Sequence, residues 1–405
     1  MVNRQLGVRI MPWALAFTFF VVPLFPSFIA LTAVTIPGVS LVPPRVSIAL
    51  LGIVAAIAIY ALVMLVRPPR ERPPTLVPLV LWLGAALLAA VLGFDPRGGA
   101  LFIGIFGLSV VWHLCVLRFY RAPGVARAIF WSYLLSGAIA SFAAIVMILT
   151  RRPADEYTIG HGRAIGTFIL PGELAGYLII FLPVAYGVAR VSRSAALRAL
   201  AWSALALGSA AFVLTFSRAG WMGFAAAVAF FVFFTQRVRR RYALAVLAAG
   251  TVAVLVAFNV HHNPSENYTR LSIWQAALEI MRRFPLTGVG PFDFARIYPL
   301  VRLPDGDPTA FHAHGFLLTI FAETGLVGVL AVLYAWWRFV IALRARLRSA
   351  PRGYALLAYA VAAGLVGTWV QGLIDTVSVV IFGLWLPSMA LALACASDGL
   401  AEDPL

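Results

Sequence analysis

The sequence predicts an all-α polytopic membrane protein. Hydrophobic residues make up 62% of its 405 residues, charged residues only 11%, and the mean hydropathy is +0.95. A soluble fold of this length does not need so much apolar surface. The apolar residues also gather in runs of about twenty, the length at which a helix spans a bilayer.

We expect about twelve membrane spans. Hydropathy places them at residues 10–33, 45–66, 75–93, 99–117, 127–149, 171–189, 197–216, 219–236, 242–260, 314–343, 354–373 and 377–396. The tenth is long and contains Glu323 and Gly325, which predicts a tilt, a kink or a half-buried start. The chain thus divides into nine spans (1–260), one large polar loop (261–313), and three spans with a tail (314–405).

The arginines predict the orientation of these spans. Nineteen of the 31 basic residues, all of them Arg, lie at the N-terminus or near the loops that follow even-numbered spans. Glu71 is the only acid in those segments before the C-terminal tail. Because Arg-rich loops stay in the cytoplasm, both termini are predicted to be cytoplasmic and the loop 261–313 to face outward.

The same distribution argues against other partners and cofactors. A net charge of +16 invites a nucleic-acid interpretation, but the arginines are scattered over short loops. Cys115 and Cys395 lie far apart, in or at the end of apolar runs, so neither a disulfide framework nor a zinc site is indicated. We therefore expect membrane lipids and no nucleic acid as partners.

The long polar stretch 270–323 begins with a predicted amphipathic helix. One face is expected to hold Leu271, Trp274, Ala277, Leu278, Met281 and Phe284, with Arg270, Gln275, Glu279, Arg282 and Arg283 away from it. Pro285 and the pair Gly288/Gly290 end the helix in a loop. An Arg-rich helix on the membrane surface, followed by His314 at the start of a span, indicates an anionic lipid-linked substrate.

Four outward-facing arginines are candidate ligands for such a substrate: Arg163, Arg218, Arg270, and either Arg282 or Arg283. Arg218 lies in TFSRAGWMG, between two spans with almost no loop, where a charge is costly and usually functional. The alternative is a snorkelling side chain that closes a helical hairpin. Near Arg163, helix-start chemistry explains Pro171 and Glu173 but not the arginine itself.

His314, Glu323 and Asp375 are the remaining candidates. A lone histidine is often structural, but His314 lies beside arginines, and Glu323 and Asp375 are acids in or at the edge of apolar helices. His312 is a weaker candidate on an exposed loop, and at a helical start we expect it to point to another face than His314. The two histidines could form a metal pair, but no further ligand follows at a recognisable spacing. Prolines flank the pair Asp305/Asp307, which a solvated turn explains. We expect no metal.

Taken together, these motifs resemble the bacterial O-antigen ligase family, within the O-antigen ligase/polymerase group. The resemblance covers most of the chain and is closest at residues 163–328. The matching segments are GRAIGTFILPGELAGYL, TFSRAGWMG, RLSIWQAALEIMRRFPLTGVGPFDF and HGFLLTIFAETGLVG. The chain departs from the family at Gly315, where Asn is usual, and at Gly172 and Glu173, where Pro-Asn is common.

The resemblance implies a GT-C-like glycosyltransferase at the periplasmic face of the bacterial inner membrane. It would move a glycan from undecaprenyl diphosphate to lipid A–core, with inversion and without metal or cofactor. His314 would be the base that takes the proton of the acceptor hydroxyl. The residues expected to contact substrate are Arg163, Arg218, Arg270, Arg282, Glu323 and Asp375.

Two other classes of function remain open. An O-antigen polymerase or a protein O-oligosaccharyltransferase would share the donor but use another acceptor. A twelve-span transporter or lipid flippase would show internal repeats and charges deep in several spans, and the sequence has no convincing repeat.

Overall fold

The computed structural model describes residues 13–24, 72–168, 170–235, 264–304, 306, 310–375 and 385–397, with isolated residues between 241 and 252. Every regular element in this part of the chain is helical, which confirms the all-α prediction. Seven helices are long and apolar enough to span a membrane. They are α5 (Pro96–Phe119), α6 (Val125–Thr150), α8 (Pro171–Val191), α9 (Ala195–Leu214), α10 (Arg218–Thr235), α14 (Phe316–Leu347) and α15 (Arg352–Gly372).

Shorter apolar helices cover Trp13–Leu24, Leu76–Leu92 (α4) and Trp385–Cys395 (α17). With the seven long helices, they overlap ten of the twelve predicted spans. The other two, 45–66 and most of 242–260, lie outside the described residues. The less apolar helices are α7 (Ala154–Ile159), α12 (Pro264–Arg283) and α13 (Phe294–Val301).

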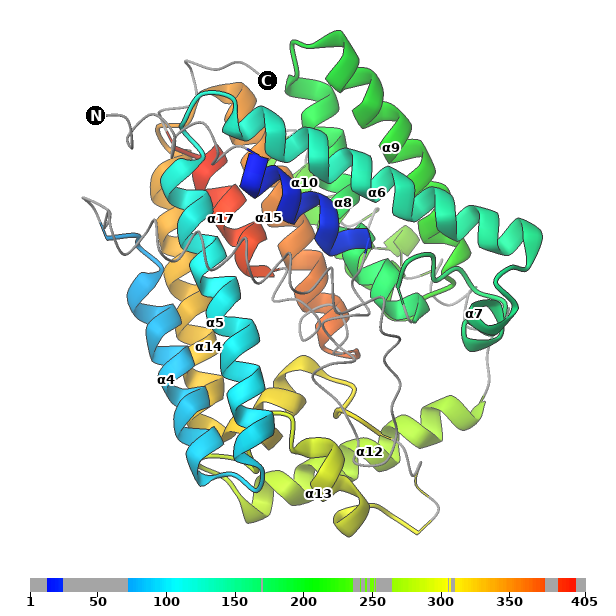
Figure 1. Ribbon diagram of the computed structural model, residues 1–405, viewed down its shortest axis with the longest axis vertical. Helices are drawn as coiled ribbons and strands as arrows, with labels where there is room; N and C mark the ends of the chain where they lie inside the picture. The colour runs from blue at the N-terminus through cyan, green and yellow to red at the C-terminus, as the bar shows by residue number, and fades with distance from the viewer. Residues whose placement is uncertain are drawn as a thin grey trace.

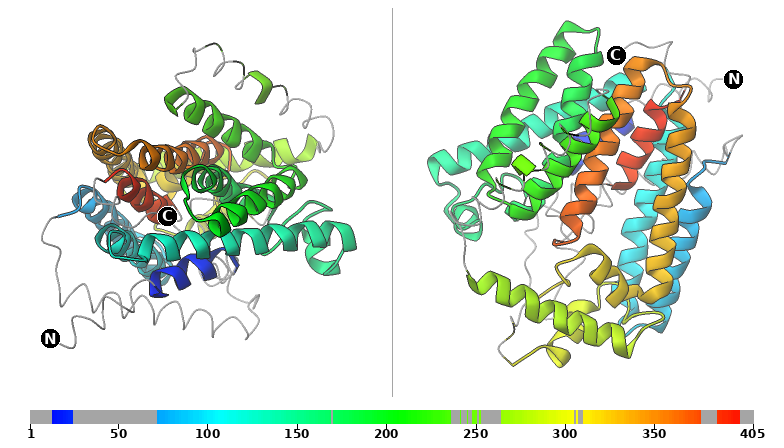
Figure 2. Two further views of the ribbon diagram at one scale, coloured as in Figure 1. Left: turned by 90° about the horizontal axis from the view of Figure 1, so that it is seen from above. Right: turned by 180° about the vertical axis from the view of Figure 1, so that it is seen from behind.

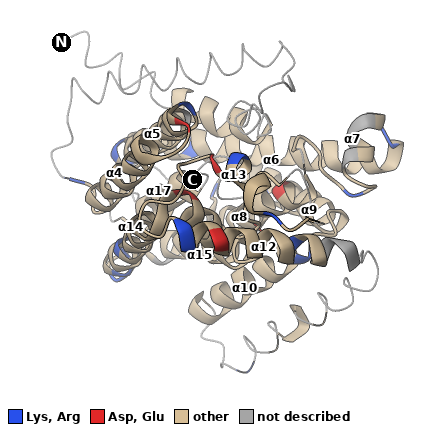
Figure 3. Ribbon diagram, turned by 90° about the horizontal axis from the view of Figure 1, so that it is seen from below, with Lys and Arg blue, Asp and Glu red and all other residues tan. Residues whose placement is uncertain are grey.

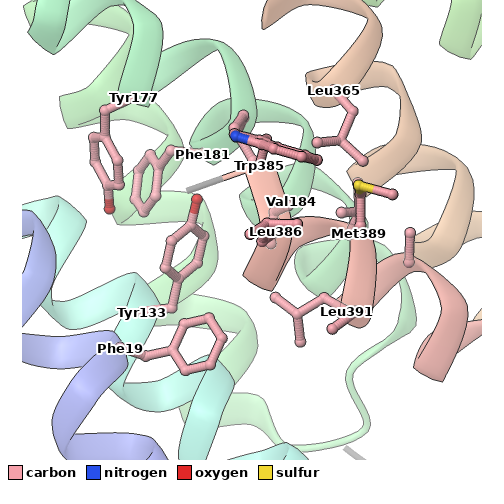
Figure 4. Close-up of a cluster of buried hydrophobic side chains, with 14 of the residues drawn as sticks. Phe19, Tyr133, Tyr177, Phe181, Val184, Leu365, Trp385, Leu386, Met389 and Leu391 are labelled. Atoms are coloured by element: carbon pink, nitrogen blue, oxygen red, sulfur yellow. The ribbon is translucent and has the colours of Figure 1, made fainter. Parts of the chain in front are cut away.

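The long helices form two groups joined by α15 and α17 (Figures 1 and 2). Helix α4 packs against α5 and α14, while α8 packs against α9, α10 and α15. Helix α17 contacts α5 on one side and α15 on the other. The core around α17 is largely aromatic and aliphatic (Figure 4), with ring pairs Phe19–Tyr133 at 6.1 Å and Tyr133–Phe181 at 5.4 Å between centroids.

Helices α12 and α13 lie across one end of the bundle, called here the α12 end (Figures 1 and 2). The predicted amphipathic helix is present. On its predicted apolar face, Leu271 and Leu278 are each 54% exposed, whereas Ala277 is buried. The stripe that packs against the rest of the fold is Ile273, Ala276, Ala277 and Ile280. Both stripes are apolar and helically spaced, so periodicity alone does not tell which one packs on α13 and α14.

The predicted kink in the tenth span is confirmed. Helix α14 is broken at Gly325, where φ is 64° and ψ is −167°. Residues 326–347 alone are about 33 Å long at 1.5 Å per residue. That length crosses a hydrocarbon core of about 30 Å, so residues 316–324 form a separate helical piece at the α12 end.

The break leaves backbone groups of α14 without helical partners, and residues 285–290 bind them. The amides of Leu326 and Val327 donate to the carbonyls of Pro285 and Leu286 at 2.9 and 3.3 Å. In return, the amides of Val289 and Gly290 donate to the carbonyls of Ala322 and Glu323 at 2.9 and 3.0 Å. Buried backbone amides and carbonyls are nearly always hydrogen-bonded, and these four bonds supply the partners that the break removes.

Glycine makes this close contact possible. A Cβ on Gly325 would overlap the backbone of Leu286, and one on Gly288 would overlap that of Glu323. Both glycines also have positive φ values, 64° and 67°. The pair Gly288/Gly290, expected to be a loop, is thus a loop that completes a broken helix.

The hairpin between α4 and α5 packs against the same loop. The Phe94 amide donates to the Val289 carbonyl at 3.0 Å, and the Asp95 amide donates to Asp293 Oδ2 at 2.7 Å. Arg296 pairs with Asp95 at 2.8 Å. The break therefore links α12, α13, α14 and the α4–α5 hairpin.

We predict that Gly325→Ala destabilises the protein. The φ of 64° and ψ of −167° at this position belong to a region essentially restricted to Gly, where an L side chain costs about 1–3 kcal/mol before any steric overlap is counted. Gly104→Ala is the matched control, because a Cβ at that helical position meets nothing within 4 Å, and Ala favours a helix by up to about 1 kcal/mol. Thermal unfolding in detergent should show a lower Tm for Gly325→Ala alone. Equal Tm values for the two variants would contradict this account of the break.

Candidate functional site

Hydrogen bonds to side chains of α12 and α14 hold the segment before α14. His314 has a φ of 45°, in the left-handed region. Its amide donates to His312 Nδ1 at 3.2 Å, and its carbonyl accepts from Trp274 Nε1 at 3.1 Å. The Ala313 amide donates to Thr319 Oγ1 at 3.2 Å, one turn into α14. The backbone of His314 is therefore fixed relative to α12 and α14.

His312, His314 and Asp375 come together here. Their imidazole nitrogens and carboxylate oxygen lie within 4.8 Å of one another, and the two imidazole centroids are 4.5 Å apart. Asp375 follows α15, is only 7% exposed, and its Oδ1 has no hydrogen-bond partner among the described residues. The expectation that His312 points to another face was wrong, because both histidines precede the helix and their rings meet.

Two helix starts converge on this group. A Cβ on Gly172, in the first turn of α8, would lie 2.8 Å from Asp375 Oδ2. A Cβ on Gly315, just before α14, would lie 3.5 Å from the Leu373 carbonyl oxygen. Neither helix has a side-chain cap. Uncapped helix starts favour anions, so the group lies beside a site suited to negative charge.

Arg218 is the first residue of α10. Ser217 Oγ caps this helix by accepting from the Gly220 amide at 3.2 Å, which makes the short turn that the sequence predicts. A Cβ on Gly223 would lie 3.1 Å from the Gln371 side chain, so the start of α10 packs near the end of α15. A cation at a helix start is unfavourable unless an anion accompanies it.

Arg270 lies one turn before Trp274 on α12 and is half-buried. Beyond the effect of burial, its charge lies close enough to the histidines to lower the pKa of the His312 imidazole. Burial lowers the pKa of the His312 imidazole to about 3; His314 and Arg270 act in the same direction, and Asp375 acts against them. His312 is therefore neutral at ordinary pH.

His312, His314 and Asp375 could hold a metal ion by residue type and by spacing, because one ligand atom of each lies within 4.8 Å of the others. The tautomer of His312 argues against a metal. His312 Nδ1 accepts a hydrogen bond, so the neutral ring carries its proton on Nε2. A metal at Nε2 needs the other tautomer.

Arg282 is not part of this group. Its Nε and Nη2 donate to both carboxylate oxygens of Glu279 at 2.9 and 3.0 Å, and Arg283 donates to the same acid at 2.7 Å. These bonds lower the pKa of Glu279 to about 2. Arg282 is 77% exposed and lies about 12 Å along α12 from Trp274. Basic and acidic residues lie next to each other on α12 (Figure 3).

Glu323 and Arg163 also form hydrogen bonds to residues outside the group of His312, His314 and Asp375. The buried Glu323 carboxylate is hydrogen-bonded to the backbone of Phe292 and Phe294, at the start of α13. Arg163 Nε donates to the Gly160 carbonyl at 3.4 Å, within the loop before α8. The structure thus groups Arg270, His314 and Asp375, with Arg218 on a helix that packs beside them.

Two residues of this site are not among the predicted substrate contacts. The sequence predicts Trp274 only as part of an apolar face, whereas its indole donates a hydrogen bond to the His314 carbonyl. It predicts His312 only as a weak candidate on an exposed loop. The spacing His-x-His was the available signal, because a side-chain acceptor two residues before an amide can bind it, as in Asx turns.

Residues 203–333 match the family model described as O-antigen ligase. The match confirms the resemblance that the sequence suggested and supports a glycosyltransferase of the O-antigen ligase/polymerase type. It runs from α9 into α14 and includes Arg218, Arg270, His312 and His314. A comparison with curated proteins found no match.

We predict that His312, His314 and Asp375 do not form a zinc site. Zinc titrated into the purified protein should show no stoichiometric binding by calorimetry, and EDTA should leave the Tm unchanged. Asp375→Asn, which keeps the shape of the side chain, serves as the control. One bound zinc per chain that Asp375→Asn removes would contradict the tautomer assigned to His312.

Proposed function

We propose that this protein, whose residues 203–333 match the O-antigen ligase family, transfers a glycan from undecaprenyl diphosphate to lipid A–core. The reaction would take place at the periplasmic face of the bacterial inner membrane, without a metal. The observation that carries the proposal is the meeting of His314 and Asp375 with the starts of α8 and α14. The proposed base, His314, would thereby lie beside helix starts that favour an anion.

The distribution of arginines supports the periplasmic assignment. The turns after α5, α8 and α14 lie at the end of the bundle opposite α12, and Arg121, Arg193 and Arg348 lie in or beside them. At the same end, Arg346 Nη1 donates to the Leu393 carbonyl at 2.9 Å and so caps α17. By the positive-inside rule this end would be cytoplasmic, which supports a candidate site on the outer side.

On the donor side, the diphosphate is the leaving group. As the anomeric carbon–oxygen bond breaks, its electron pair and negative charge pass to the diphosphate. Arg218, Arg270 and the helix starts would stabilise that charge, because guanidinium groups bind phosphate bidentately and helix amides favour anions. This arrangement needs no divalent cation.

On the acceptor side, a sugar hydroxyl must lose its proton as its oxygen attacks the anomeric carbon. His314 would take that proton, since an imidazole is the usual base near neutral pH. Attack opposite the leaving diphosphate, with no covalent intermediate on the protein, inverts the anomeric centre.

An O-antigen polymerase or a protein O-oligosaccharyltransferase would use the same donor chemistry, so the acceptor separates the candidates. We expect that deletion of the gene leaves lipid A–core bare while undecaprenyl-linked polymer accumulates. Analysis of lipopolysaccharide by gel and mass spectrometry, with plasmid complementation as the control, would show this. Single repeat units on the core would instead indicate a polymerase.

Arg218 and Arg270 should be sensitive to replacement by Lys. A point charge lacks the planar fork of the guanidinium, so Arg218→Lys and Arg270→Lys should each lower the rate of transfer on the order of a hundredfold. Arg282→Lys is the matched control, because Arg282 is exposed and paired with Glu279. The measurement is glycan transfer by purified protein in detergent. If Arg282→Lys were as impaired as Arg270→Lys, the donor site would lie further along α12.

A further inference from the structure

His312 contributes to the site in two ways. Its Nδ1 accepts the amide of His314, a residue in the left-handed conformation that L side chains avoid. Its ring also packs on the His314 ring. A residue held in such a conformation needs surrounding contacts to keep it there, and His312 provides one of them directly.

The other ring nitrogen of His312 is a hydrogen-bond donor. Since Nδ1 is an acceptor and the ring is neutral, the proton is on Nε2. The charged or titratable groups that act on this ring are His314, Asp375 and Arg270. The group therefore offers one N–H donor, one imidazole and one carboxylate. One nitrogen of each histidine and one oxygen of Asp375 lie within 4.8 Å of one another.

This set of groups can bind a hydroxyl. Three groups that share one hydroxyl oxygen at about 2.8 Å lie about 4.6 Å apart, and the separations here do not exceed 4.8 Å. Asp375 Oδ1 is buried and has no hydrogen-bond partner among the described residues. Such a carboxylate oxygen requires a donor, and a sugar hydroxyl or its neighbour on the same ring would supply one.

We propose that His312, His314 and Asp375 form the pocket for the acceptor's sugar hydroxyl, and that His312 fixes the position of His314 in it. Nδ1 holds the His314 backbone, and Nε2–H donates to the hydroxyl oxygen. The hydroxyl proton passes to His314 as the oxygen attacks, and Asp375 stabilises the resulting imidazolium. This inference rests on the proposed function, because it names where the acceptor of that reaction binds.

Two amide variants separate the roles of the two ring nitrogens. In His312→Asn, the amide oxygen takes the place of Nδ1 and can still accept the His314 amide. In His312→Gln, the amide lies one bond further out, near the place of Nε2, and this contact is lost. His312→Ala removes both. We would measure kcat and the KM for donor and acceptor with purified protein, together with Tm.

His312→Ala and His312→Gln should lower kcat about a hundredfold, the effect of misplacing a reacting group by about 1 Å. The donor KM should not change. His312→Asn should restore kcat to within about tenfold of the wild type, with a raised KM for the acceptor because Nε2–H is missing. Tm should fall in the Ala and Gln variants and recover in the Asn variant.

The inference would be overturned if His312→Ala kept at least half of the wild-type kcat, or if His312→Gln matched His312→Asn. A wild type that transfers nothing from the lipid diphosphate would instead refute the proposed function. In that case the Tm pattern still tests the Nδ1 contact. Equal Tm values for the Asn and Gln variants would refute the contact itself.

Discussion

The break in α14 at Gly325 is the constraint on which the arrangement of the site depends. A membrane helix cannot leave its amides and carbonyls unpaired, so an interruption requires a partner segment. Residues 285–290 provide that partner through four backbone hydrogen bonds, and they bring α12, α13 and the α4–α5 hairpin with them. The backbone conformation at Gly325 thereby connects most of the elements at the α12 end.

The break also sets the depth of the site. The part of α14 after Gly325 is long enough to cross the bilayer, so His314, which precedes the shorter part, would lie beyond the hydrocarbon core. There the starts of α8 and α14 meet Asp375, and Trp274 and His312 hold the His314 backbone. A site at this level can receive the headgroup of a lipid-linked donor while the lipid tail remains in the membrane.

Hydropathy and the kink-prone pair Glu323/Gly325 predicted the helices and the break, because both follow from local composition. The face of α12 was not predictable, since two apolar stripes have the same period and only packing on α13 and α14 distinguishes them. Arg282 matched the family motif as well as Arg270 did, but it pairs with Glu279. The contact of Asp375 with His312 and His314 joins residues more than sixty positions apart, which spacing alone cannot show.

The central claim is that the outer helix starts and arginines bind the diphosphate beside His314. An experimental structure with a bound undecaprenyl diphosphate analogue tests it most directly. The account predicts phosphate oxygens within hydrogen-bonding distance of Arg218 and Arg270, next to the starts of α8 and α14. A diphosphate bound instead at Arg282 and Arg283, with the histidines remote from it, would contradict the account.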